Sequence, residues 1–224
     1  MTKEFKMDRE KVRIAIDGPS GAGKSTIAKA VAKELNIDYI DTGAMYRALG
    51  YKLAGKGIPA VESPELLEVL DNTDIDFSEG NIILDGVVVN DKIRTPEISK
   101  MASDVSAIPI VRKKLVALQQ KIAGNKSVIM DGRDIAEVVI PDAEYKYFMT
   151  ASAEERAERR YKELIAKGED VTFEKVLSDI EKRDYNDSHR AASPLRQVEG
   201  AQLLDTTGMS IEEVVNHILE EVRK

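Results

Sequence analysis

The sequence predicts an α/β protein with a parallel sheet that is covered by helices on both faces. Short β-branched apolar runs alternate with segments of helical periodicity along most of the chain. A glycine-rich turn, GPSGAGKS at 18–25, separates the first run from the first periodic segment. Asp85-Gly86 between two β-branched runs predicts an antiparallel hairpin within 74–90. We therefore expect a parallel core that carries an antiparallel insert.

The N-terminal elements are two strand-helix units. VRIAID at 12–17 is a β-branched run that ends at a glycine, so it predicts a strand. TIAKAVAKELN at 26–36 repeats apolar residues at helical spacing, with Asn36 as its C-terminal stop. DYID at 38–41 predicts a short second strand that leads into a helix over 42–57.

The elements after the insert continue the alternation. Two helices, 96–108 and 109–124, are divided by Pro109. The later strands are expected at the apolar runs 127–131, 144–149 and 202–207. The later helices are expected at 152–168, 172–192 and 210–224. No internal repeat or low-complexity linker interrupts residues 1–224, so we expect one domain with inserted lobes.

Composition excludes several classes of site. The 224 residues contain no cysteine, which rules out disulfides and thiolate metal sites, and two isolated histidines do not form a zinc site. A net charge of −7 argues against a nucleic-acid surface. No stretch approaches the roughly 20 apolar residues of a membrane span. The mixed charge of residues 1–11 lacks the apolar region of an export signal, so we expect a cytoplasmic protein without membrane attachment.

The turn at 18–25 matches the phosphate-loop pattern G-x-x-x-x-G-K-[ST]. Its backbone N–H groups and the following helix N-terminus suit ATP phosphates, with Lys24 at the β and γ phosphates and the Ser25 hydroxyl on Mg²⁺. The alternative is an ordinary glycine-rich turn. The residues predicted to bind ATP are Gly18, Pro19, Ser20, Gly21, Ala22, Gly23, Lys24, Ser25 and Thr26.

Among phosphate-loop proteins, a small kinase fits best. A GTPase needs Asn-Lys-x-Asp after a late strand, whereas NKS at 125–127 precedes a strand and lacks the aspartate. A hydroxyl acceptor would need a catalytic carboxylate, for which Asp131 or Asp41 is available. A nucleoside monophosphate acceptor instead calls for guanidinium groups. Arginines recur at element ends, at Arg47, Arg94, Arg112, Arg133, Arg156, Arg159, Arg160, Arg183, Arg190 and Arg196.

This pattern favours a phosphate acceptor. Arg156 and Arg160 share a helix face and suit a lid over the transferring phosphoryl group, which makes them candidate catalytic residues beside Lys24. Arg159 either joins them or pairs with Glu155. A hydroxyl-acceptor kinase and an ATP-responsive binding protein without turnover stay open as alternatives.

Five motifs in order resemble the bacterial cytidylate kinase family: IDGPSGAGKST, DTGAMYRAL, IRTPEISKMASDVSAIPIVR, IMDGRDIAEVVIPDA and RDYNDSHRAASPL. The resemblance implies a nucleoside monophosphate kinase fold with a five-stranded parallel sheet. It also implies a monophosphate-binding insert at about 64–98 and a short lid at about 154–168. The implied reaction, in pyrimidine metabolism, is Mg²⁺-dependent transfer from ATP to CMP or dCMP. A kinase with two closing lobes can work as a monomer, and we expect one here.

The resemblance also implies roles for matching residues. Thr42, Arg112, Asp134 and Arg190 would face the pyrimidine, Ser103, Arg183 and Asp187 the sugar, and Arg47 and Arg133 the acceptor phosphate. Thr42 stands where relatives often have serine, so its hydroxyl is kept and a methyl is added.

The chemistry of cytosine agrees with these roles. Its amine donor beside the N3 and O2 acceptors complements a carboxylate beside a guanidinium, whereas uracil would leave both groups unpaired. Asp134 would also suit a structural ion pair with Arg133 or another arginine. Asp187 would also suit a helix cap or an exposed helix charge. Asp131 is a candidate for the Mg²⁺ water shell, for orienting arginines, or for a structural role.

Overall fold

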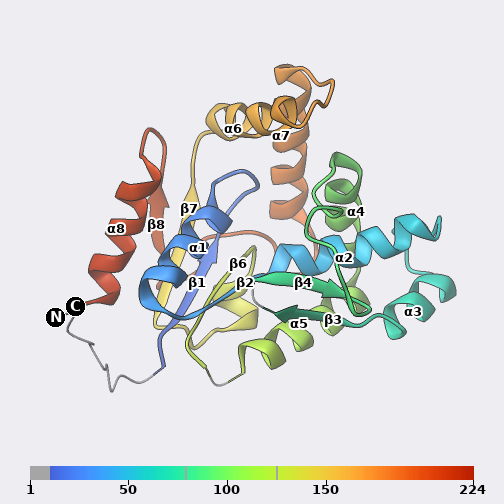
Figure 1. Ribbon diagram of the computed structural model, residues 1–224, viewed down its shortest axis with the longest axis horizontal. Coiled ribbons are helices and arrows are strands. Elements are labelled where there is room, and N and C mark those ends of the chain that lie inside the picture. Colours follow the sequence, from blue (N-terminus) through green and yellow to red (C-terminus); the bar gives the residue numbers. More distant parts are fainter. Residues whose placement is uncertain (1–10, 79, 125) are drawn as a thin grey trace.

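The computed structural model describes residues 11–78, 80–124 and 126–224 (Figure 1). Its centre is a five-stranded sheet in the order β2-β6-β1-β7-β8. Its strands are β1 (Arg13–Asp17), β2 (Asp38–Asp41), β6 (Val128–Gly132), β7 (Tyr145–Thr150) and β8 (Gln202–Asp205). All neighbouring pairs are parallel, so the predicted fold class is confirmed. The expectation about an export signal falls mainly on residues 1–10, outside the described part of the chain.

Helices cover both faces of this sheet. They include α1 (Lys24–Leu35), α2 (Thr42–Gly55), α5 (Pro109–Ala123) and α8 (Ile211–Val222). Ile14 and Ile16 pack into one core with α1 and α8, while Ala15 packs into another with α5 and β6. Such two-sided burial explains why β1 is apolar throughout rather than alternating. Asn36 ends α1 with φ 53°, as the sequence predicts.

The insert is larger than one hairpin. It contains α3 (Pro64–Asp71) and an antiparallel sheet of β3 (Ile75–Ser78), β4 (Asn81–Leu84) and β5 (Val87–Val88). Asp85 and Gly86 both have positive φ, 49° and 79°, as the predicted β4-β5 turn requires. α3 was not predicted, although Ser63 caps it and Pro64 occupies its first turn. The hydrophobic core of the insert is continuous with residues of α2, α4 (Pro96–Ser106) and α5.

A second lobe follows β7 in the chain. α6 (Ala153–Ala166) and α7 (Phe173–His189) pack together around Ala157, Leu164, Val176 and Ile180, a small core of their own. In Figure 1 they stand at the top, and α7 descends toward the carboxyl ends of the strands. The predicted lid residues 154–168 therefore lie mainly on α6.

A second short element, besides α3, was not predicted. η1 (Ile135–Val139) is a single π-helical segment directly after the Gly132-Arg133-Asp134 turn. Asp17 pairs in register with Gly132, and Asp41 pairs with Asp131, so the carboxyl ends of β1, β2 and β6 meet beside this turn. Within the described ranges, no helix combines the length and apolarity that a membrane span requires.

Candidate active site

The phosphate loop joins β1 to α1 through residues that need glycine. Gly21 and Gly23 have φ of 77° and 88°, and a Cβ on Gly18 would lie 1.9 Å from the Met149 carbonyl oxygen. The N-cap residue of α1 is Gly23, which has no side chain to cap the helix, so the N–H groups of its first turn could bind a phosphate. The Lys24 ammonium donates to the Pro19 carbonyl at 2.7 Å. Burial lowers the pKa of Lys24 to about 7, and nearby Arg133 adds to this effect.

Asp131 lies directly beneath the loop at the end of β6. Its carboxylate accepts hydrogen bonds from the Ser25 hydroxyl at 2.9 Å and from the Tyr39 hydroxyl at 2.8 Å. Burial raises the pKa of Asp131, and neighbouring Asp41 raises it further. The predicted Mg²⁺ ligand Ser25 is therefore in direct contact with a carboxylate that the sequence placed only near the loop.

Arg47 and Arg94 meet at Asp41, which ends β2. Asp41 accepts from the Ala44 N–H as the cap of α2, and from Arg47 at 2.7 Å. Arg94, at the end of the insert, is 3.4 Å from the same carboxylate. Burial raises the pKa of Asp41, but Arg47 and Arg94 outweigh it, and the net pKa is lowered. Asp41 therefore holds two guanidinium groups near the end of the sheet.

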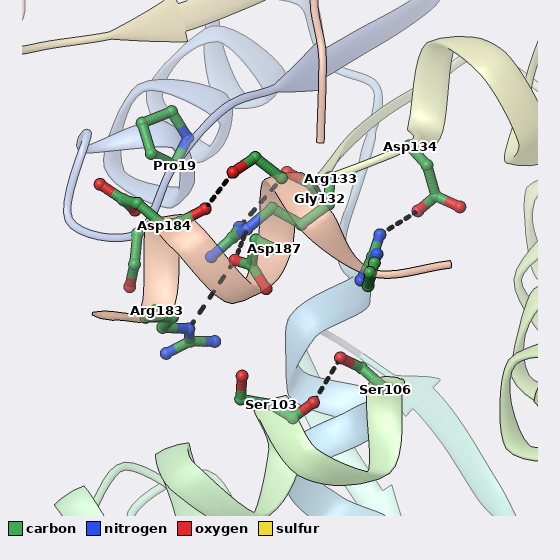
Figure 2. Close-up of polar contacts among 12 residues, drawn as sticks. Pro19, Ser103, Ser106, Gly132, Arg133, Asp134, Arg183, Asp184 and Asp187 are labelled. Atoms are coloured by element: carbon green, nitrogen blue, oxygen red, sulfur yellow. Dashed lines mark hydrogen bonds and ion pairs between the residues drawn. The ribbon is translucent and has the colours of Figure 1, made fainter. Parts of the chain in front are cut away.

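Asp187 draws together two further arginines from different elements. Its carboxylate accepts from Arg133 Nε at 2.7 Å and lies 3.9 Å from Arg183 Nε (Figure 2). Burial and, after it, the charge of Arg133 together lower the pKa of Arg183 to about 10. Asp187 is buried near the C-terminus of α7, so an N-cap or an exposed helix charge is wrong for it. The two guanidinium groups share this carboxylate, and Asp184 adds negative charge near both of them.

Asp134 forms a second buried cluster. It pairs with Arg112 of α5 and lies 3.9 Å from Arg190, which follows α7. The ion-pair partner is thus Arg112, not Arg133. Arg190 Nη2 is buried without a hydrogen-bond partner among the described residues. This cluster has unused donors, as a polar ligand site requires.

A cleft of about 410 Å³ opens between α4 and α7, next to both clusters. Ser103 of α4 lines one wall, and Asp187 and Arg190 line the other. In Figure 2, Ser103 faces Arg183 and Asp187 across this space. Thr42 lies deeper, where its hydroxyl donates to the Asp131 carbonyl oxygen at 2.8 Å. Its oxygen can still accept a hydrogen bond.

The three lid arginines take different positions. Arg156 is buried and donates to the Ser20 carbonyl oxygen of the phosphate loop at 2.9 Å and to Asp184 at 2.7 Å. Arg160 instead pairs with Glu163 at 3.0 Å. Arg159 pairs with Glu155, and its Nη1 is 3.6 Å from where a Cβ of Gly23 would be. Arg156 and Arg159 therefore reach the loop here, and a catalytic role for Arg160 stays a prediction.

The family model described as Cytidylate kinase matches residues 14–224. The chain belongs to the cytidylate kinase family. The cytidylate kinase of Clostridioides difficile is 52% identical over 93% of this chain and 97% of its own length. That of Caldicellulosiruptor saccharolyticus is 53% identical over 94% and 95%. An uncharacterized protein from Eubacterium ventriosum has the same fold, with a TM-score of 0.55 at 13% identity over 96% of this chain and 99% of that chain.

In this cytidylate kinase family member, sequence reasoning missed three contributors to the site. Tyr39 orients Asp131, Asp184 pairs with Arg156, and Asp17 hydrogen-bonds the backbone after Asp134. Tyr39 and Asp41 are two residues apart in β2 and therefore lie on the same face of the strand, so the strand period could have indicated Tyr39 as a site residue. Asp17 ends a strand directly before the phosphate loop, which was a signal as well. Asp184 depends on how α7 packs on α6, which no local pattern reveals.

Proposed function

We propose that this protein transfers the γ-phosphoryl group of ATP to CMP and dCMP, giving CDP and dCDP. The observation that carries this proposal is the buried Arg112-Asp134-Arg190 cluster beside a phosphate loop. The carboxylate would accept from the cytosine amine while guanidinium donors face its O2 and N3 acceptors. Thr42 would complete this base site from the start of α2.

The acceptor phosphate would bind among guanidinium groups that come from different elements of the fold. Arg47 and Arg133 are each held by one aspartate, Asp41 and Asp187, and remain able to donate to phosphate oxygens. The charges of Arg133 and Arg183 lower the pKa of Lys24, and the charge of Arg133 lowers the pKa of Arg183, so a bound anion would relieve this repulsion. The sugar would lie between Ser103, Arg183 and Asp187 at the cleft.

ATP would occupy the loop from Gly18 to Thr26, with Lys24 at its β and γ phosphates. Mg²⁺ is commonly held by one or two protein oxygens together with substrate phosphates. The Ser25 hydroxyl and the Asp131 carboxylate, 2.9 Å apart, fit such a donor set. The ion would neutralise charge on the transferring phosphoryl group. We assign Ser25 as its direct ligand and Asp131 to its surrounding water.

The attacking oxygen of a nucleoside monophosphate is already ionised, so this chemistry needs no general base. Catalysis would come from alignment of the two phosphates and from neutralisation of charge by Lys24, Arg156 and Arg160. Closure of the insert, 64–98, and of the lid, 154–168, would exclude water. We propose that a cytoplasmic monomer carries this out without nucleic acid or a membrane.

A hydroxyl-acceptor kinase fits less well. It would need a free carboxylate, but Asp131 already accepts from Ser25 and Tyr39. Asp41 accepts from Ala44 and Arg47. An ATP-responsive binding protein without kinase activity would need no second, arginine-rich ligand site.

The test is ADP release with ATP and Mg²⁺ plus CMP, dCMP, UMP, AMP or shikimate. Release should be fastest with CMP and dCMP, and Lys24→Ala should abolish it. Release with shikimate alone would favour a hydroxyl acceptor. ATP binding without release in any mixture would favour the non-catalytic alternative.

A further inference from the structure

Asp17, the last residue of β1, has no role in the proposed reaction and is nevertheless only 2% exposed. Both of its oxygens are used by one short stretch of backbone. One accepts from the Ile135 N–H at 2.8 Å and the other from the Ala136 N–H at 2.9 Å. These residues are far from Asp17 in sequence, but Asp17 pairs in register with Gly132, close before them.

The first of these hydrogen bonds acts on Asp134. The Ile135 N–H belongs to the peptide unit that joins Asp134 to Ile135, so fixing its direction fixes ψ of Asp134. That angle is 29°, with φ at −148°, which is not helical. The Asp134 side chain leaves the chain at this same Cα. Asp17 therefore constrains the backbone from which the Asp134 side chain extends.

Asp17 also takes over a task that Asp134 would ordinarily perform. Asp134 is the N-cap residue of η1, and aspartate at that position commonly accepts from the first backbone N–H groups of its own helix. Here Asp134 makes no such bond, and its carboxylate pairs with Arg112 instead. The acceptors come from Asp17 on the neighbouring strand. Asp134 is thereby left available to guanidinium groups and to a ligand.

Keeping a carboxylate at Asp17 has a cost. The pKa of Asp17 is raised to about 6, mainly by burial and to a smaller extent by the charge of Asp134. The hydrogen bonds from the Ala136 and Ile135 N–H groups and the charge of Lys24 act in the opposite direction and lower it. A buried charge of this kind is retained where its hydrogen bonds are needed.

We propose that Asp17 is a positioning residue for base selection. By fixing the backbone at 134–136, it keeps the Asp134 carboxylate where it can pair with Arg112 and accept from the cytosine amine. This inference rests on the proposed function. Because Gly18 follows directly, the same residue links the start of the ATP loop to the base-reading carboxylate.

The test is Asp17→Asn, in which the amide can accept from only one of the two N–H groups and turns an NH₂ toward the other. The CMP-to-UMP ratio of kcat/KM should fall about tenfold, while the ATP dissociation constant changes less than about twofold. Ile16→Val, also buried in β1, is the matched control and should change stability but not the ratio. CMP and UMP dissociation constants give the same comparison without turnover.

A double-mutant cycle separates positioning from general structural support. If Asp17 acts through Asp134, then Asp17→Asn should not lower the ratio further in an Asp134→Asn background. A lower unfolding temperature with an unchanged ratio, or independent losses in the double variant, would overturn the inference. If Asp17→Asn does not fold, Asp17→Ser carries the same measurements. Failure of the wild-type protein to use CMP would instead refute the proposed function.

Discussion

Asp134 and Arg112 form a buried ion pair between the turn after β6 and helix α5, 22 residues apart in the chain. Both side chains are less than a tenth exposed, and Arg190 approaches the free oxygen of Asp134. A buried pair of this kind stabilises weakly by itself, because desolvation of both charges offsets their attraction. Because Arg190 also lines the cleft, the position of the pair supports a role in recognition.

Arg112→Lys should weaken selection of the base. Lysine keeps the positive charge beside Asp134 but loses the planar fork that donates at two points. We expect the KM for CMP to rise about tenfold and discrimination against UMP to narrow, with little change in ATP affinity. Steady-state kinetics with varied CMP and UMP measure this. Arg196→Lys, at the exposed pair with Glu137, is the matched control and should leave both values unchanged.

Asp187→Asn should affect CMP more than dCMP. The amide keeps the shape of the side chain but loses the charge that Arg133 and Arg183 share, together with acceptor capacity for ribose hydroxyls. We expect a loss of about tenfold to a hundredfold in kcat/KM for CMP, a smaller loss for dCMP, and near-normal ATP binding. Parallel loss of CMP and ATP binding would show that Asp187 has been placed in the wrong subsite.

Lys24 should couple ATP binding to proton uptake. Its folded-state pKa of about 7 lies below its usual value of 10.5, so the unfolded chain binds more protons between these values. Stability without nucleotide should therefore rise with pH across that window. ATP phosphates favour the charged form, so calorimetry at about pH 8 in buffers of different ionisation enthalpy should detect uptake of a proton. Lys24→Met should remove both the rise of stability with pH and the proton uptake on ATP binding. If stability still rises with pH in this variant, the titrating group is not Lys24.

Gly18→Ala should disrupt the phosphate loop. Gly18 has φ 151°, and its new methyl group would lie 1.9 Å from the Met149 carbonyl oxygen on β7. We expect a loss of about 3 kcal/mol or more in the free energy of unfolding, with ATP binding impaired. Gly55→Ala is the matched control: it lies in α2 with nothing within 4 Å of the added Cβ, and it should be neutral or stabilising. Denaturant unfolding measures both, and equal stability of the two variants would contradict the steric argument.

The core elements followed closely from local patterns. β2 has the predicted bounds, and α1 ends where Asn36 was expected to stop it, because strand and cap signals are carried by adjacent residues. η1 was not predicted because a five-residue run with four apolar residues does not distinguish a helical turn from a strand, and because its N-terminal acceptors come from Asp17 on another strand.

The site divides in the same way. The phosphate loop is a continuous stretch of sequence, so the spacing of its glycines alone predicted a loop that ends in Lys24 and Ser25. The sequence did not identify the ion-pair partners of Asp134 and Asp187. Each partner lies on a different element from its aspartate, and only packing brings the two side chains together. Which of the three lid arginines reaches the loop depends on how α6 sits above it.

By itself the sequence determined a parallel α/β core, a phosphate loop after its first strand and a series of arginines at element ends that suit phosphate. Hydrophobic periodicity and glycine spacing are short-range properties, and they are readable without coordinates. The tertiary structure alone decided that Asp134 pairs with Arg112, that Asp187 is shared by Arg133 and Arg183, and that Asp17 supports the turn between them. Those contacts join residues from separate strands and helices, whose approach is fixed only when the sheet and its covering helices pack.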